Sequence, residues 1–201
     1  MPSVSNGSHR QRQAERTREL ILDGARAIFL EAGYAAATIE DVARRAGVGV
    51  STVYAVLGSK RGILVALGES WGRDTGRREL LREAEIEEDL ATRLETAAHA
   101  TRREWESGAQ SMAVLESAAA ADREAARTVE TARSERERAY APLVASLGAR
   151  LRAGLDPSAA FAIFAALTRA ELYRELVGRH GWSPDRYEAW LGQTLVEQLL
   201  P

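Results

Sequence analysis

Apolar side chains recur every third or fourth residue along almost all of this 201-residue chain, and no segment shows the alternation of apolar and polar residues that is typical of a strand. This period places the apolar side chains on one stripe of an α-helix, and each stripe must be buried against another helix. Glycines interrupt the pattern where a helix would end in a left-handed residue. The sequence therefore predicts an all-α protein of about nine helices.

The first three predicted helices are a long one followed by two short ones. Thr38, with Asp41 three residues later, has the pattern of an N-cap with an acidic third position and marks the start of the second helix. Two short helices joined by a tight turn that contains glycine are typical of a helix-turn-helix, which binds DNA. The three helices are expected over about 13–32, 39–46 and 52–57, and they end at Gly33, Gly47 and Gly58.

Behind this motif the helical pattern continues to the end of the chain. Ser59 is the expected N-cap of a fourth helix that runs through Trp71 to about residue 74. Asp156 and Ser183 each precede a proline, which combines a good N-cap with a favoured first helical residue. The remaining helices are expected over about 86–106, 109–120, 123–151 with a kink near Pro142, 157–179 and 184–200.

The charge distribution agrees with a division into a DNA-binding and a regulatory part. Up to Gly62 the chain has nine Lys or Arg and six Asp or Glu, and the remainder has 18 and 23. A basic front and an acidic back suit a molecule that presents one end to a polyanion. We expect a disordered lead-in over 1–9, a DNA-binding domain over 10–58 that continues into the linking helix, and a helical regulatory and dimerisation domain over 59–201.

Composition excludes several other classes of protein. The chain has no cysteine and only three scattered histidines, so we expect no disulfide and no metal site. It shows no convergent set of base, nucleophile and metal ligands, so we expect neither an enzyme nor a bound cofactor. It has no run of about eighteen apolar residues and no basic segment before a short apolar core, so we expect a cytoplasmic protein with no membrane partner.

One continuous stretch allows a more specific interpretation. Its distinctive segments are Gly33-Tyr34, Thr38 to Ala43, Ala46 to Tyr54 and Gly58 to Leu64, which combine helix, cap, turn and the chain's only lysine in one order. The stretch from about Arg16 to Ala66 resembles the DNA-binding domain of the TetR family of bacterial regulators. The resemblance implies a recognition helix that lies in the major groove of double-stranded DNA.

Six residues of this stretch are candidates for contact with DNA. The resemblance implies that Thr38, Tyr54 and Lys60 hold phosphates, for which a helix N-terminus, a phenol hydroxyl and a compact cation are all suited. The other three occupy the turn and the start of the third helix, from which side chains reach base edges: Val50, Ser51 and Thr52.

The third helix departs from the family pattern, because basic, polar or aromatic residues are common where this chain has Val50, Ala55, Val56 and Leu57. Fewer polar groups then reach the bases. This shifts the expected DNA contacts toward an N-terminal arm, in which Arg10, Arg12 and Arg16 could cross a phosphate backbone or a minor groove. The alternative is an arginine-rich lead-in that is merely solvated.

The last two predicted helices each have a wide apolar stripe. In the TetR family the corresponding helix pair meets its copy as a four-helix bundle, so we expect a homodimer that reads a palindrome. The alternative is that both stripes pack on the preceding helices of the same chain. The candidate interface residues are Phe164, Thr168, Leu172, Tyr187, Trp190, Leu191, Thr194, Leu195 and Gln198.

Spacing alone does not locate a ligand pocket, but large apolar residues on the central helices are candidates to line one, with a histidine and an arginine as polar groups. The alternative for each apolar residue is ordinary core packing. The candidates are Trp71, His99, Arg102, Trp105, Met112, Leu115, Tyr140, Leu143 and Phe161.

The sequence thus predicts a transcriptional regulator, with repression of a palindromic operator relieved by a small-molecule effector as the family's usual mode. The alternative function is a module of the same fold that binds a small molecule or a partner and whose DNA binding is weakened. The sequence does not identify the effector, the operator, the target genes or the sign of control.

Overall fold

The computed structural model describes residues 4–71, 77–120 and 122–201, with side chains from Arg10 onward except those of residues 70 and 71. Every regular element in these ranges is a helix, and nine of the helices are eight residues or longer, which confirms the predicted fold class. The residues separate into two compact units. The N-terminal unit comprises Met1–Ser70 and Ala113–Val129, and the C-terminal unit comprises Trp71–Met112 and Glu130–Pro201.

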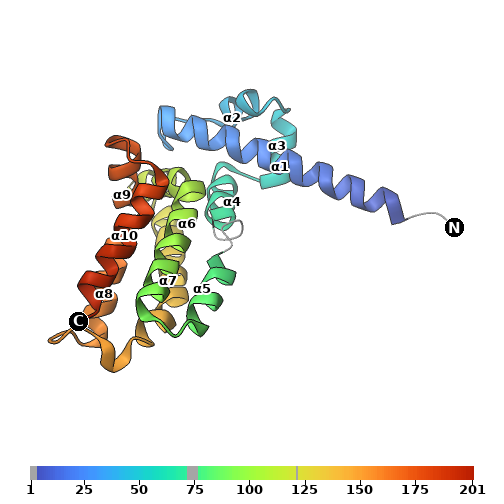
Figure 1. Ribbon diagram of the computed structural model, residues 1–201. Coiled ribbons are helices and arrows are strands. Elements are labelled where there is room, and N and C mark those ends of the chain that lie inside the picture. Colours follow the sequence, from blue (N-terminus) through green and yellow to red (C-terminus); the bar gives the residue numbers. More distant parts are fainter. Residues whose placement is uncertain (1–3, 72–76, 121) are drawn as a thin grey trace. The chain divides into compact units, whose positions relative to one another are not determined.

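The N-terminal unit is built on α1 (Val4–Ala32), against which α2 (Ile39–Ala46) and α3 (Val50–Leu57) pack (Figure 1). The three helices share one apolar core, which explains why the motif needs the long first helix. Four core side chains that are at most 2% exposed are Ile21, Phe29, Val42 and Val53.

The first helix is longer than the sequence pattern indicated. It begins at Val4, whereas the prediction placed its start at about Gln13 and a disordered lead-in before it. Gly7 and Ser8 are weak helix formers, but neither removes a backbone donor, and the Arg, Gln and Ala residues behind them favour helix. The described part of the lead-in therefore continues the helix, where the sequence pattern indicated none.

Glycines define the turns on both sides of α3. Gly47 has a φ of 68° and its N–H donates to Ala43 and Arg44, which closes α2 as predicted. Gly49, in extended conformation, precedes α3, so this helix begins two residues earlier than expected. At Gly62 a Cβ would lie 1.8 Å from the carbonyl oxygen of Leu57, so only glycine allows the next helix to cross this closely.

The N-terminal unit also contains α4 (Lys60–Trp71), the end of α6 (Leu90–Ala119) and the start of α7 (Arg123–Ala145). A Cβ at Gly68 would lie 3.4 Å from Cγ2 of Thr128 and 3.6 Å from Cδ1 of Leu115. Helix α4 therefore packs closely against both long helices. The sequence had assigned this stretch of α6 and α7 to the regulatory domain.

The C-terminal unit holds α5 (Arg77–Ile86) and most of α6 and α7. It also holds α8 (Pro157–Leu167), α9 (Ala170–Tyr173), the π-helical turn η2 (Arg174–Arg179) and α10 (Pro184–Leu199), with a short turn η1 (Gly148–Arg150). Helix α10 packs against α8 and η2 (Figure 1). The core of the C-terminal unit includes seven side chains that are at most 1% exposed: Leu94, Tyr140, Leu143, Phe164, Tyr187, Leu191 and Leu195.

Some boundaries in this unit differ from the prediction. Helix α5 lies in a stretch where the apolar pattern had given no helix. Helix α6 continues through Gly108, where two helices were expected, because one glycine costs only about 1 kcal/mol relative to alanine and the helix is packed on both sides of it. The predicted N-caps Asp156 and Ser183 are confirmed, since each side chain accepts a backbone N–H three residues later.

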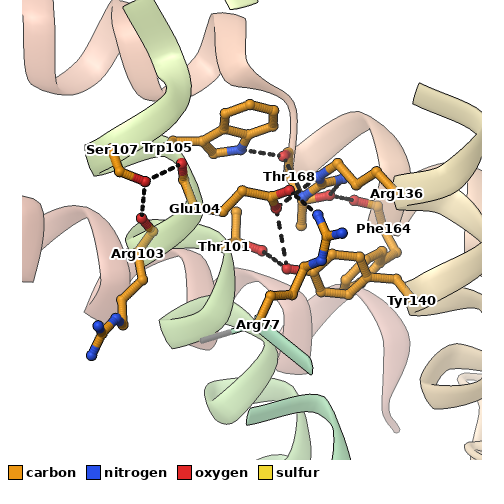
Figure 2. A network of polar contacts seen from close by, with 10 residues as sticks. All are labelled: Arg77, Thr101, Arg103, Glu104, Trp105, Ser107, Arg136, Tyr140, Phe164 and Thr168. Atoms are coloured by element: carbon orange, nitrogen blue, oxygen red, sulfur yellow. Dashed lines mark hydrogen bonds and ion pairs between the residues drawn. The ribbon is translucent and has the colours of Figure 1, made fainter. Parts of the chain in front are cut away.

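A buried ionic network lies at the centre of the C-terminal unit (Figure 2). Glu104 on α6 has no exposed surface, and its carboxylate accepts from Nε of Arg136 on α7 at 2.9 Å. The same carboxylate accepts from Arg77 on α5 and from the hydroxyl of Tyr140 at 3.4 Å. One carboxylate thus binds donors from two neighbouring helices, which satisfies the rule that a buried charge must be paired.

The network also breaks the helix that was predicted over 157–179. Arg136 donates to the hydroxyl of Thr168 at 3.2 Å and to its carbonyl at 2.9 Å, and Nε1 of Trp105 donates to the same carbonyl at 2.8 Å. Helix α8 ends at Leu167 and α9 begins at Ala170. The break contains neither proline nor glycine, so the side chains that take the Thr168 carbonyl are its physical cause.

Burial and charge set the protonation states in this network. Burial opposes the charge of Arg136, but Glu104 outweighs that effect and raises its pKa above the ordinary value. Burial, and then the negative charge of Glu104, raises the pKa of the Tyr140 hydroxyl. Both groups therefore keep their protons at neutral pH, and the network is a fixed structural element.

Replacing Glu104 by glutamine keeps its size and removes the charge that Arg136 faces. We expect the free energy of unfolding to fall by about 3–5 kcal/mol, because the buried guanidinium is left without its counter-charge. The control is Glu130→Gln. Glu130 is exposed on α7, so its replacement should change the free energy of unfolding by less than about 0.5 kcal/mol. Denaturant unfolding measures both, and equal losses would contradict this role for Glu104.

Candidate nucleic-acid interface

Thr38 acts as the N-cap of α2. Its hydroxyl accepts from the N–H of Asp41 at 3.1 Å and donates to the Asp41 carboxylate at 2.6 Å, and that carboxylate accepts from the Thr38 N–H at 3.3 Å. The Thr38 hydroxyl, and then its backbone N–H and Arg44, lower the pKa of Asp41. The cap predicted here is confirmed. Since its hydroxyl proton goes to Asp41, a phosphate contact by Thr38 would rely on the first backbone N–H groups of α2.

Lys60 at the start of α4 turns inward. Its ammonium donates to the carbonyls of Tyr34 at 2.7 Å, Ala35 at 3.2 Å and Ala37 at 2.9 Å, and it lies 4.6 Å from the centre of the Tyr34 ring. An ammonium has three protons, and these three carbonyls take all of them. In the DNA-free chain the ammonium therefore binds the loop, and the predicted phosphate contact of Lys60 stays a prediction.

The structure gives Lys60 a positioning role instead. The segment from Gly33 to Ala37 follows α1 and leads to the N-cap of α2, and within it the Gly33 carbonyl accepts from the N–H of Ala37 at 3.2 Å. Lys60 binds three other carbonyls of this segment and fixes the segment against α4. A loop of small residues directly before an N-cap was the only signal of this role in the sequence.

Helix α3 presents the candidate base-reading side chains to solvent. Ser51 is exposed, Val50 and Thr52 are half-buried, and Tyr54 is 50% exposed, while Val53 faces the core. This helix carries no acidic side chain that would repel DNA. All four candidates on α3 therefore remain predictions with accessible side chains.

The arm residues Arg10, Arg12 and Arg16 lie on exposed positions of α1. All three are part of the regular helix α1, which the sequence pattern had placed only from about residue 13 onward. Their contact with DNA stays a prediction.

Ion pairs that were not predicted from the sequence brace the motif. Arg45 of α2 binds Glu31 of α1 through two hydrogen bonds of 3.0 and 2.5 Å. Arg61 of α4 pairs with Asp122 at 3.3 Å and with Glu124 at 3.0 Å, at the turn between α6 and α7. These pairs join segments that are distant in the sequence, so helical spacing gave no signal of them.

Most of the candidate pocket residues belong to the core. Tyr140 and Trp105 take part in the ionic network, and Phe161 is half-buried. His99 lies 2.9 Å from the Glu188 carboxylate and Arg102 donates to Asp185 at 2.7 Å, so both point to α10. The side chain of Trp71 lies outside the described residues. The remaining candidates, at most 5% exposed, are Met112, Leu115 and Leu143.

The candidate dimer residues fall into two groups. Five of them are at most 1% exposed within the single chain: Phe164, Thr168, Tyr187, Leu191 and Leu195. Within the single chain these five side chains therefore have almost no surface to offer a partner, and their burial favours the alternative that the stripes pack inside the chain. Four others keep exposed surface and remain candidates, namely Leu172, Trp190, Thr194 and Gln198.

The described residues also bear on metal sites and on helices that could span a membrane. No group of three or more His, Cys, Asp or Glu side chains among them could hold a metal ion. No single described helix is long and apolar enough to cross a membrane, and only α3 and α4 taken together, bent by 56°, reach that length and composition.

Residues 21–67 match a family described as bacterial regulatory proteins, tetR family. This range begins within α1 and ends within α4, so it covers the end of α1, the whole of α2 and α3, and the first part of α4. No curated protein matches the chain.

Several solved structures share the fold. The fatty acid degradation regulator FadR from Bacillus halodurans has a TM-score of 0.71 at 16% identity, over 90% of this chain and 94% of that one. The regulator FadR from Bacillus subtilis, in complex with stearoyl-CoA, has a TM-score of 0.68 at 16% identity, over 89% and 97%. The TetR family regulator PfmR from Thermus thermophilus has a TM-score of 0.66 at 18% identity, over 90% and 99%. At identities of 16–18% this likeness shows only that the chain has the same all-α fold as these proteins.

Replacing Lys60 by methionine keeps the apolar stem and removes the ammonium that three carbonyls bind. We expect the free energy of unfolding to fall by about 1.5–3 kcal/mol, because hydrogen bonds to a charged group are lost and the carbonyls are partly buried. The neighbouring Arg61→Met removes only exposed ion pairs, so we expect it to lower the free energy of unfolding by less than Lys60→Met does. Thermal and denaturant unfolding measure both.

The same variant separates the two roles of Lys60 in DNA binding. If the ammonium positions the loop, the slope of log affinity against log salt stays unchanged in Lys60→Met. A slope that falls by about one unit would show a direct phosphate contact and overturn the positioning role.

Proposed function

Residues 21–67 make this chain a member of the tetR family of bacterial regulatory proteins, and from this premise we propose that it is a homodimeric transcriptional regulator that binds a palindromic operator. Helix α3 enters the major groove, with Val50, Ser51 and Thr52 near base edges and Tyr54 at a phosphate. The observation that carries the proposal is the exposed face of α3, which lacks acidic side chains and begins at a turn with little bulk.

The second part of the proposal is repression that a small-molecule effector relieves. Helices α6 and α7 contribute residues to both compact units, and their connecting turn binds Arg61 directly beside Lys60. A ligand that shifts α6 or α7 therefore acts on the start of α4. Such a ligand changes DNA affinity only if it binds the free and the DNA-bound forms with different affinity. The relative from Bacillus subtilis was solved with stearoyl-CoA, which supports a ligand-responsive regulator.

Two copies are required because a palindrome has twofold symmetry. The surface that supports self-association is the exposed side of the C-terminal helices. Trp190 lies there with its ring 5.8 Å from that of Trp182, and Thr194 follows one turn later on α10. Half-buried tryptophans at a surface are typical of interfaces.

The alternative function, a module of the same fold with weakened DNA binding, is favoured by the apolar residues Val50, Ala55 and Val56 on α3. Selection of bound duplexes from a random DNA library decides between the two. The proposal expects enrichment of a palindrome whose half-sites are one helical turn or a multiple of it apart. Binding without sequence enrichment, or no binding at low salt, supports the alternative.

Two variants of α3 separate base reading from phosphate contact. Thr52→Ala should weaken binding to the selected operator by about 1–3 kcal/mol and leave binding to random DNA unchanged, because a base-edge contact is lost. Tyr54→Phe should weaken both alike, because only a phosphate contact is lost. Fluorescence anisotropy with both duplexes measures this. If Thr52→Ala weakened random DNA as much as operator, its assigned role would be wrong.

The dimer is tested with a matched pair on α10. Thr194→Arg places a charge on the proposed interface, while Thr194 itself bonds only to the carbonyl of Trp190 on its own helix at 2.7 Å among the contacts described. We expect a folded monomer by sedimentation velocity at micromolar concentration, and loss of operator binding. Gln193→Arg, on the adjacent exposed position, should remain dimeric. A native chain that sediments as a monomer refutes the proposal.

A further inference from the structure

A cavity of about 790 Å³ lies between α5 and α7, apart from the residues predicted to form a ligand pocket. This volume is within the range of small-molecule sites, roughly 300–1,000 Å³. The α7 residues follow each other at helical spacing, so one face of α7 lines it, and α5 contributes residues from several of its turns. The lining residues are Arg77, Arg78, Glu79, Leu81, Arg82, Glu85, Glu135, Arg138, Ala139 and Pro142.

The lining is rich in arginine. Four arginines and three glutamates give it one net positive charge, since four less three is one. Arg78, Arg82 and Arg138 are exposed and form no ion pair with any residue that the structure describes. Guanidinium groups present forked donors that match the oxygens of a carboxylate or a phosphate.

The fourth arginine, Arg77, is held in position by the buried carboxylate of Glu104. Arg77 lines the cavity and also donates to the buried carboxylate of Glu104, with 16% of its own side chain exposed. A cation fixed in this way is pre-organised, so a ligand does not bear the cost of ordering it. The apolar part of the lining, Leu81, Ala139 and Pro142, offers contact to an organic group.

We propose that the cavity between α5 and α7 binds a small organic anion, a carboxylate or a phosphate ester, through Arg82 and Arg138 beside the fixed cation of Arg77. Taking this anion as the effector rests on the proposed function. The placement suits that role, because Arg77 shares the Glu104 carboxylate with Arg136, which holds the break between α8 and α9.

Titration calorimetry of the full chain with phenyl phosphate tests the site. Phenyl phosphate should bind, benzoate should compete with it, and phenyltrimethylammonium, which has the same ring and the opposite charge, should not. The double variant R82Q/R138Q should raise the dissociation constant of phenyl phosphate about tenfold or more, because two charge-assisted contacts are lost. The control is Arg133→Gln, an exposed arginine of α7 outside the lining, which should bind as the native chain does.

Absence of phenyl phosphate binding, equal binding of the cation, or equal weakening in Arg133→Gln overturns the inference. These outcomes are independent of the DNA experiments. A chain that selects an operator but ignores phenyl phosphate keeps the proposed function and loses this site. A chain that binds phenyl phosphate through Arg82 and Arg138 but selects no DNA sequence keeps the site and loses the proposed function.

Discussion

The buried charge of Glu104 is the constraint on which the arrangement of the C-terminal helices depends. A carboxylate without exposed surface requires cations, and Arg136 and Arg77 come to it from α7 and α5. The remaining N–H groups of Arg136 donate to the hydroxyl and the carbonyl of Thr168. These two ion pairs therefore join three helices, and one of their arginines determines where the next helix is broken.

Features that depend on neighbouring residues could be predicted from the sequence. Thr38, Asp156 and Ser183 cap helices because each side chain reaches a backbone N–H three residues away. Gly47 ends α2 because a residue without Cβ adopts the left-handed conformation without steric cost. The break at Thr168 could not be predicted, since its causes lie on other helices at Trp105 and Arg136.

The candidate site shows the same division. Exposure of Ser51 and Tyr54 follows from the period of α3 once Val53 is known to face the core. The role of Lys60 did not follow, because its partner carbonyls stand 23 to 26 residues earlier in the chain. The stripe on α10 was predicted correctly, but a stripe does not reveal what covers it, and Leu191 packs within its own chain.

Adjacent residues at the start of α4 connect two different parts of the N-terminal unit. Lys60 holds the loop that leads to the N-cap of α2, and Arg61 holds the turn between α6 and α7. The first contact is partly buried and uses every proton of the ammonium, whereas the second is exposed and is screened by salt. The contact at Arg61 is therefore the weaker of the two. Helix α4 also packs directly on α6 and α7 at Gly68, so the proposed ligand response would reach α4 through this packing as well as through Arg61, and would reach the loop before α2 through Lys60.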